Sequence, residues 1–238
     1  MTGDSDSAER FVSGHSRAFW VIVILLAGVL IDLIAVGADS LEANLISRAI
    51  NGEFITYAEA VANDERQTFI AFIQLAISLI TVALFCIWIH RAHRNLKPLN
   101  AKNLKFSSGW AVGWFFVPIM NLFRPYQVMK EIWKASDPGV DAADDTAWQH
   151  TPGSSLLGWW WGFWLAANLA GTIAWNLLWR GEELSELLGA SIAYMISDFL
   201  FIPASLFLIQ IIRTIDRRQE EKYSQLSSNR TLSVNHPF

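Results

Sequence analysis

The stretch from Leu156 to Trp179, LLGWWWGFWLAANLAGTIAWNLLW, decides the fold of this chain. It runs for 24 residues without an Asp, Glu, Lys, Arg or His. An α-helix rises about 1.5 Å per residue, so about 20 apolar residues cross the roughly 30 Å hydrocarbon core of a bilayer. The sequence therefore predicts a helix that crosses a membrane.

Three further stretches approach or meet that length: residues 18–38, interrupted only by Asp32, residues 69–89 and residues 187–212. The composition agrees, because 53% of the residues are hydrophobic and only 17% are charged, against about 25% in a soluble domain. We expect an all-α fold, a polytopic transmembrane helical bundle with four spans (18–38, 69–89, 156–179 and 187–212) in a single transmembrane domain, residues 18–212.

The charged residues of the connecting segments predict the orientation. Residues 39–68 carry six acids but only two arginines, with a turn expected at Asn51-Gly52, whereas residues 91–105 and 213–238 each carry five Lys or Arg. Retained cytoplasmic loops are rich in Lys and Arg. Both termini are therefore expected in the cytoplasm, with residues 1–17 a disordered N-terminal tail and 213–238 a cytoplasmic C-terminal tail.

A cleaved signal peptide is an alternative for the first hydrophobic run. Arg10 and Arg17 precede an apolar core, and Ala35-Val36-Gly37 has small residues at the spacing of a cleavage site. The leader would be long and its core contains Asp32, so a signal anchor is the favoured interpretation.

Tryptophan is abundant, with 12 residues in the chain. Four of them lie at or near the ends of the hydrophobic runs, where an indole ring suits the interface between acyl chains and headgroups; these expected belt residues are Trp20, Trp88, Trp159 and Trp179. Cys86 is the only cysteine, which excludes an intrachain disulfide and predicts a small packing residue.

Residues 107–123 are expected to form a hairpin rather than a fifth span. Trp110 to Leu122 is uncharged for 13 residues, which is about 20 Å as a helix and too short to cross. Pro118 removes a backbone donor in its middle. A re-entrant hairpin, with Gly109 and Gly113 allowing close helix approach, and a short tilted helix at the interface both fit.

Residues 125–136 have the period of an amphipathic helix that lies on the cytoplasmic membrane surface or docks on the bundle. Pro125 suits its first turn. The apolar arc holds Tyr126, Val128, Met129, Ile132, Trp133 and Ser136, and the polar arc holds Gln127, Lys130, Glu131 and Lys134. Residues 137–155 are expected to be a solvated linker.

The residues in and around this hairpin follow a distinctive order, carried by Trp88, Arg91, Asn95, Gly109, Trp110, Gly113, Pro118, Asn121, Arg124, Pro125, Glu131 and Trp133. This order resembles a known bacterial membrane family, domain of unknown function 4328, over about residues 70–215. The resemblance implies a multi-pass protein of the bacterial inner membrane and carries no activity, ligand or catalytic residue with it.

Two polar residues inside the expected spans form the candidate site. Asp198 lies near the middle of the last span, and Asn168 lies near the middle of the preceding one, so antiparallel packing would place them at similar depth. A carboxyl group there is expected to be protonated, bonded to Asn168 or directed into a wet cavity. Asp32 is expected to reach the surface, and Pro203 is expected to kink the last span.

The basic end of the second span offers a weaker candidate. His90 and His93 are three residues apart, but no cysteine or second histidine pair accompanies them, so headgroup contact is favoured over a metal or haem site. Arg91 and Asn95 share a helical face. They are expected to bind lipid phosphate or to support the turn at 121–125, with support favoured.

Three classes of function remain open. The chain contains no HExxH, GxSxG, P-loop or His/Cys cluster, so an enzyme ranks last and no metal or cofactor is expected. A small transporter or channel would use the mid-membrane polar residues. A non-catalytic sensor or scaffold module ranks first, with membrane lipids, a second copy or another membrane protein as partners and no nucleic acid.

Overall fold

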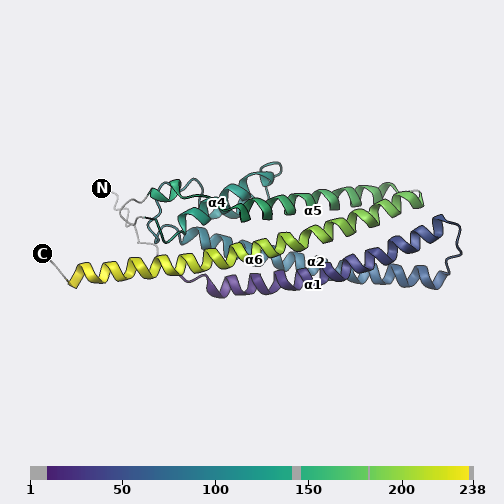
Figure 1. Ribbon diagram of the computed structural model, residues 1–238, viewed down its shortest axis with the longest axis horizontal. Coiled ribbons are helices and arrows are strands. Elements are labelled where there is room, and N and C mark those ends of the chain that lie inside the picture. The colour runs from purple at the N-terminus through teal and green to yellow at the C-terminus, as the bar shows by residue number, and fades with distance from the viewer. Residues whose placement is uncertain (1–9, 141–145, 182, 236–238) are drawn as a thin grey trace, which may run out of the picture. The chain divides into compact units, whose positions relative to one another are not determined.

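The computed structural model describes residues 10–140, 146–181 and 183–235. Every regular element in these ranges is helical, which confirms the all-α prediction (Figure 1). The elements, in chain order, are α1 (His15–Ile50), α2 (Tyr57–Arg94), α3 (Ser108–Gly113), the 3-10 turn η1 (Met120–Leu122), α4 (Arg124–Ala135), the 3-10 turn η2 (Ala147–His150), α5 (Ser155–Arg180) and α6 (Leu184–Asn235).

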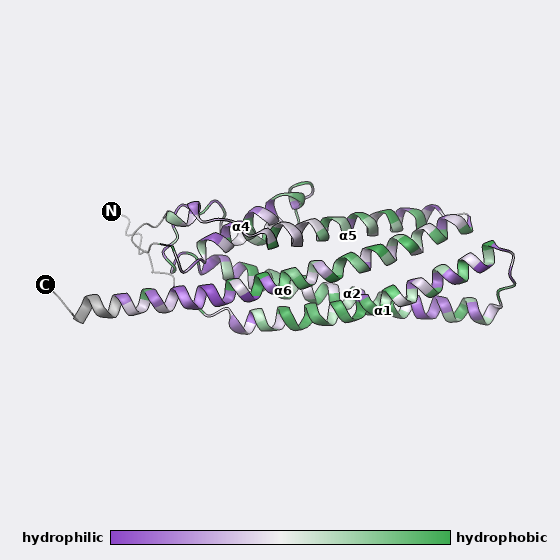
Figure 2. Ribbon diagram, viewed as in Figure 1, coloured by the Kyte–Doolittle hydropathy of each residue, from purple (hydrophilic) through white to green (hydrophobic). Residues whose placement is uncertain are grey.

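Three of the long helices have the length and composition needed to cross a membrane: α1, α2 and, from Leu184 to Asn229, α6. Their middle parts are dominated by hydrophobic residues (Figure 2). The fourth long helix, α5, is long enough, but its six Trp and two Asn lower its mean hydropathy and it is not in this set. Helices of this kind indicate a membrane protein.

The first two long helices extend well beyond the predicted spans and meet at the predicted turn. The chain breaks after Ile50, and Gly52 adopts a positive φ of 81°. Thr56 then starts α2, because its hydroxyl accepts from the Glu59 backbone N–H while the Glu59 carboxylate accepts from the Thr56 backbone N–H and hydroxyl. This reciprocal arrangement is a capping box, and the backbone bond from Thr56 lowers the pKa of Glu59.

The chain divides into two compact units, and each of the four long helices contributes a segment to both. Unit 1 comprises residues 1–22, 83–158 and 210–238, and unit 2 comprises residues 23–82 and 159–209. Unit 1 also contains all of the short elements. Unit 2 is built from the long helices alone.

Small residues bring α5 and α6 close together within unit 2. The Ser197 hydroxyl donates to the Ala167 carbonyl at 3.0 Å, and a Cβ placed on Gly171 would approach Ser197 Oγ to 3.3 Å. The glycines of the aromatic motifs do not have this role. Within the described part of the chain, a Cβ on Gly109, Gly158 or Gly162 would meet no other group within 4 Å, and one on Gly113 would meet the Trp110 ring of the same helix.

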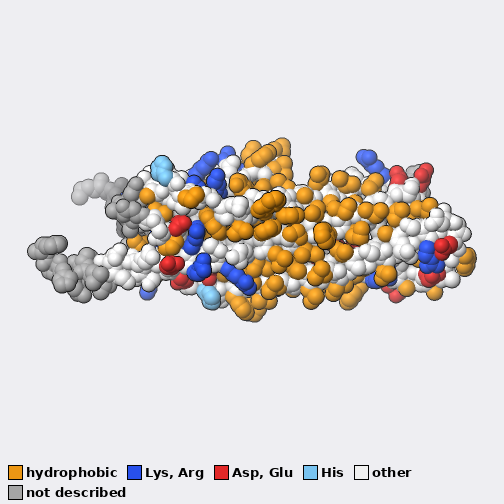
Figure 3. All heavy atoms as spheres, in the orientation of Figure 1, with side chains coloured by type: hydrophobic (Ala, Val, Ile, Leu, Met, Phe, Trp, Pro, Cys, Tyr) orange, Lys and Arg blue, Asp and Glu red, His pale blue; other side chains and the backbone are white. Residues whose placement is uncertain are grey.

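Large apolar side chains are exposed along the long helices. In the face shown in Figure 3, hydrophobic side chains cover the middle of these helices, and charged ones gather towards the helix ends. The exposed side chains include Leu30, Phe72, Leu79, Leu169 and Phe199. A water-soluble monomer rarely exposes so much apolar surface, whereas a bilayer solvates it.

The four expected belt tryptophans separate into two groups. Trp20, Trp159 and Trp179 are exposed, as an interfacial position requires, whereas Trp88 is only 1% exposed. The Trp88 ring lies 5.6 Å from that of Phe85, which in turn contacts the Phe115 ring edge-on. The belt assignment of Trp88 is therefore wrong, because its ring packs inside the protein beside Phe85 of the same helix.

Candidate functional site

The segment predicted as a hairpin consists of the short helix α3, the 3-10 turn η1 and the turns between them. Ser107 caps α3, because its hydroxyl accepts from the Trp110 backbone N–H, and the helix ends after only six residues. Pro118 and Ile119 follow, and Ile119 has a φ of 67°, which is strained for a β-branched residue. The Asn121 N–H then donates to the Val117 carbonyl. No single helix runs through the segment.

The helix predicted at 125–136 forms as α4, but its polar arc is not a solvated face. Gln127 and Lys134 are half-buried, Lys130 is exposed and Glu131 is buried. The Glu131 carboxylate accepts from the Lys105 N–H at 2.6 Å and the Phe106 N–H at 3.3 Å, and it lies 3.1 Å from His93 Nε2. Its place on the polar arc therefore does not mark Glu131 as solvated, because these three donors bind its carboxylate inside the protein.

His93 is correspondingly not available to lipid headgroups. Its side chain is 2% exposed, and its Nε2 is the partner of Glu131. His90 behaves differently, because its Nδ1 lies 3.0 Å from the Ser108 carbonyl and therefore donates to it. The two histidines of the HRAH motif thus hold different segments against α2: His93 fixes α4, and His90 fixes the start of α3.

Asn95 joins the N-terminal segment to α6 rather than supporting the turn at 121–125. Its amide nitrogen donates to the Val12 carbonyl at 2.9 Å and to Gln219 Oε1 at 3.2 Å, and its oxygen accepts from the Val12 N–H. Gln219 in turn donates to the Ala92 carbonyl and to the Ser136 hydroxyl. This buried network ties together four segments: the N-terminal segment, the end of α2, the residue after α4, and α6.

The predicted disorder of residues 1–17 fails for the part that the structure describes, while residues 1–9 lie outside it. Phe11 is buried and stacks on Tyr223 with ring centroids 4.3 Å apart. His15 opens α1 and lies 3.0 Å from Asp216. Burial raises the pKa of Asp216, and His15 opposes that rise. A polar, Ser- and Gly-rich segment is ordered here because α2 and α6 supply partners for it.

The C-terminal part of α6 contacts α4 in the same unit. The Lys222 ammonium donates to the Ala135 carbonyl at 2.9 Å, and the Arg218 guanidinium lies 4.5 Å from the centre of the Trp133 ring. Burial lowers the pKa of Lys222. Arg124 and Pro125 open α4, with Arg124 over the Trp114 ring and Pro125 buried.

The expected solvated linker at 137–155 also contains a packed residue, although residues 141–145 lie outside the described ranges. Trp148 in η2 is buried, and its indole N–H donates to the Lys102 carbonyl at 2.9 Å. Lys134 donates to the Gln149 carbonyl. Trp148 therefore anchors this segment to the residues after α2, which its acidic composition did not predict.

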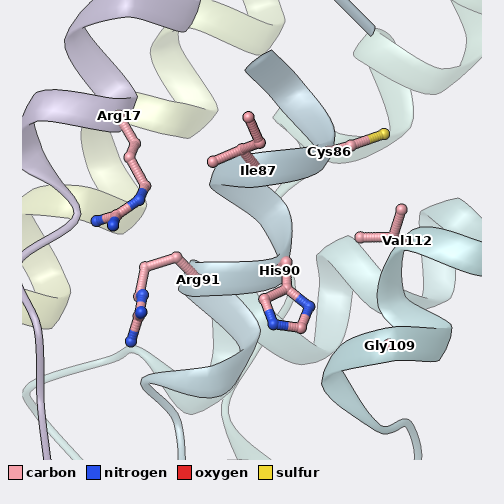
Figure 4. Close-up of a pocket in the computed structure, with 7 residues that line it drawn as sticks. All are labelled: Arg17, Cys86, Ile87, His90, Arg91, Gly109 and Val112. Atoms are coloured by element: carbon pink, nitrogen blue, oxygen red, sulfur yellow. The ribbon is translucent and has the colours of Figure 1, made fainter. Parts of the chain in front are cut away.

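A hollow of about 440 Å³ lies in unit 1, beside the basic end of α2. Figure 4 shows the guanidinium groups of Arg17 and Arg91 on the same side of α2, whereas Cys86 and the His90 ring lie towards α3. Seven residues line the hollow: Arg17, Cys86, Ile87, His90, Arg91, Gly109 and Val112. Three are basic, and the others are apolar or small.

A second polar site lies in unit 2, where Gln74 of α2 connects two carboxyl groups from other helices. Its side-chain nitrogen lies 3.2 Å from Asp198 Oδ2 of α6 and 3.5 Å from Asp32 Oδ1 of α1. Asp198 also interacts electrostatically with Asp39 and Tyr194. One amide therefore bridges three helices in their apolar parts.

This geometry corrects the expected partner of Asp198. Asn168 is exposed, and its amide donates to the Trp164 carbonyl of its own helix at 2.7 Å. Asp32, expected at the surface, is half-buried and joins the Gln74 site. The sequence did contain a signal for the missed residue, because Gln74 interrupts an apolar run as Asp198 does.

The described ranges contain no group of three or more His, Cys, Asp or Glu side chains able to hold a metal ion. The two sites are a carboxyl–amide–carboxyl cluster inside apolar helices and a basic, partly apolar hollow. Carboxyl groups can gain or lose a proton, and basic side chains can pair with an anion.

Long apolar helices with polar groups among them define an integral membrane protein of the helical class. The chain belongs to the family described as domain of unknown function DUF4328, whose model matches residues 51–217. The match includes both Gln74 and Asp198 and all of the motif residues from Trp88 to Trp133. Comparison with curated proteins and with solved structures gave no match.

Proposed function

We propose that the protein is a non-catalytic sensor module of the bacterial cell membrane that responds to protonation of the cluster formed by Asp32, Gln74 and Asp198. The observation that carries this proposal is the Gln74 amide, which donates to carboxyl groups from two other helices. Ionisable groups inside transmembrane segments are costly and usually functional. A cluster that joins three helices can convert proton binding into a change of helix packing.

The chemistry of the cluster explains why protonation would alter the packing. Two ionised carboxylates that share one amide repel each other in a medium of low dielectric constant. When one carboxyl group is protonated, the repulsion disappears and its O–H can donate to a neighbouring oxygen. Asp39 and Tyr194 are the other titratable groups that interact with Asp198, so they would modify the pH at which this happens.

The helix that carries Asp198 also carries the groups that hold α4. Arg218, Gln219 and Lys222 contact residues of α4 or the segment directly after it. A shift or rotation of α6 would change these contacts. The module would then report the protonation state through α4 and the C-terminal part of α6, which we propose to lie in the cytoplasm.

The test compares melting temperatures in nanodiscs at acidic and alkaline pH. Asp198→Asn keeps the size of the side chain but cannot titrate, so we expect it to fold and to lose most of the pH dependence of the wild type. Asp198→Leu should leave the Gln74 amide without this partner and lower stability by about 1–3 kcal/mol.

The matched control is Asp64→Asn, because Asp64 is exposed on α2. We expect it to keep the pH dependence of the wild type. A pH dependence that survives in Asp198→Asn, or a more stable Asp198→Leu protein, would show that the cluster is not the proton-binding element.

A proton-coupled transporter or channel is the second candidate, favoured by further polar groups in unit 2. Asp39 is buried with one carboxylate oxygen unpartnered among the described residues. Gln67 donates to both Asp39 and Glu42, and Asn63 also donates to Glu42. In proteoliposomes loaded with a pH-sensitive dye, a proton flux that Asp198→Asn abolishes would favour transport over sensing.

The proposed topology has four spans, with α5 as the span between the 107–123 hairpin and the outer 180–186 loop, and both termini in the cytoplasm. Lys and Arg at the expected inner ends support it. In a Cys86→Ala background, an impermeant thiol reagent added to intact cells should label Phe54→Cys and spare Gln149→Cys. Both positions are exposed, so labelling of position 149 from outside would contradict this topology.

A further inference from the structure

We propose that the hollow lined by Arg17, His90 and Arg91 binds the phosphate group of an anionic phospholipid, with the start of an acyl chain along Ile87 and Val112. The site belongs to unit 1 and is separate from the Asp32–Gln74–Asp198 cluster. Such a site would make the stability of unit 1 depend on the lipid composition of the membrane.

The basic groups of the hollow match a phosphate. Arg17 comes from the first turn of α1 and Arg91 from the end of α2, and their guanidinium groups lie on the same side of α2 (Figure 4). Guanidinium groups bind phosphate oxygens through paired, charge-assisted hydrogen bonds. The seven lining residues include no Asp or Glu, so none of them would oppose an anion.

His90 shapes the wall between α2 and α3. Because its Nδ1 donates to the Ser108 carbonyl, the ring is fixed and Nε2 is the nitrogen left to accept, or to donate when the ring is protonated. The bond also keeps Gly109 and Val112 at the wall.

The apolar part of the hollow distinguishes a lipid from a free anion. Ile87 is 54% exposed although it belongs to an apolar helix, and Val112 faces the same space from α3. Phe19, Trp20 and Trp110 are exposed on the elements that carry the lining residues. Aromatic side chains of this kind are typical of the level of the headgroups. A ligand with an anionic head and an apolar tail fits both halves.

The experiment measures lipid retained by the purified protein, by native mass spectrometry after extraction from phosphatidylcholine nanodiscs that contain a minor fraction of phosphatidylglycerol. The wild type should retain phosphatidylglycerol preferentially. Because a hydrogen bond to a charged group contributes about tenfold or more in affinity, Arg17→Gln should lower the preference about tenfold, and the double variant Arg17→Gln/Arg91→Gln should lower it on the order of a hundredfold.

The matched control is Lys130→Gln/Arg213→Gln, which removes the same charge from exposed positions of unit 1 outside the hollow. It should retain the wild-type preference. Equal losses in the control and the double variant would show general charge attraction and overturn the proposal. If the double variant does not fold, the single variant Arg17→Gln tests the proposal. Arg17 has one described hydrogen bond, to the Ser13 carbonyl, so this variant is expected to fold.

Inorganic phosphate distinguishes the two sources of a phosphate group. Added to the protein in pure phosphatidylcholine nanodiscs, it should raise the melting temperature much less than phosphatidylglycerol does. Equal stabilisation by inorganic phosphate would assign the hollow to a soluble anion and contradict the lipid proposal.

Discussion

Glu131→Ala is expected to lower the free energy of unfolding by about 3–5 kcal/mol, because it leaves several buried donors without an acceptor at a cost of about 1–3 kcal/mol each. Glu131 is buried and accepts from the Lys105 and Phe106 backbone N–H groups and from His93. Alanine would leave all three donors without this acceptor. Thermal and denaturant unfolding in detergent, followed by circular dichroism, measures the loss.

Two variants on the same helix make this test specific. Lys130→Ala changes the neighbouring exposed residue, so its stability should stay within about 0.5 kcal/mol of the wild type. Glu131→Gln keeps one acceptor oxygen but directs an amide N–H towards the donors. Its loss of stability should therefore lie between that of Lys130→Ala and that of Glu131→Ala. A Glu131→Ala protein as stable as Lys130→Ala would refute the buried role of the carboxylate.

Trp88→Ala should produce a loss of similar size, about 3–5 kcal/mol, because a large buried aromatic side chain leaves a cavity when it is truncated. Trp88 is almost completely buried, in contact with Phe85. The same unfolding measurements apply. Intrinsic fluorescence of the variant would also show which part of the signal comes from a buried indole.

Trp20→Ala is the matched control, since both residues belong to unit 1 and both were expected at the membrane interface. Trp20 is 55% exposed, so its truncation removes lipid or headgroup contact and leaves no cavity. We expect a loss well below that of Trp88→Ala. Equal losses would mean that Trp88 occupies an interfacial position after all.

The positions of the long helices were predictable because a long stretch of sequence without charged residues strongly indicates a membrane-spanning helix. The helix ends were not, because a hydrophobic pattern marks the part of a helix that lipid solvates rather than the helix itself. α1 continues to Ile50 through an acidic segment, and α6 continues to Asn235 through a basic one. Charged residues outside the bilayer are good helix formers, so hydropathy alone could not set the boundaries.

The candidate site was predictable in part. Asp198 was identified because a carboxyl group in an apolar helix is exceptional. Its partner was not, because equal depth leaves the rotation of each helix about its axis undetermined. That rotation directs Asn168 to the surface and brings Gln74 to Asp198.

Glu131 illustrates a different limit of sequence reasoning. A helical projection places it on the polar arc, and a charged residue there is usually solvated. Its burial depends on the backbone N–H groups of Lys105 and Phe106. A hydropathy pattern contains no information about which backbone donors lie near a side chain.

The Asn95 network has a consequence for the order in which the protein matures. Asn95 holds Val12 from the start of the chain and Gln219 from near its end, and Phe11 stacks on Tyr223. A chain is synthesised from its N-terminus. Phe11 therefore emerges long before Tyr223, and the contact between them can form only after nearly all of the described chain has been made. Until translation has passed Tyr223, the N-terminal segment lacks the partner that α6 supplies to Phe11.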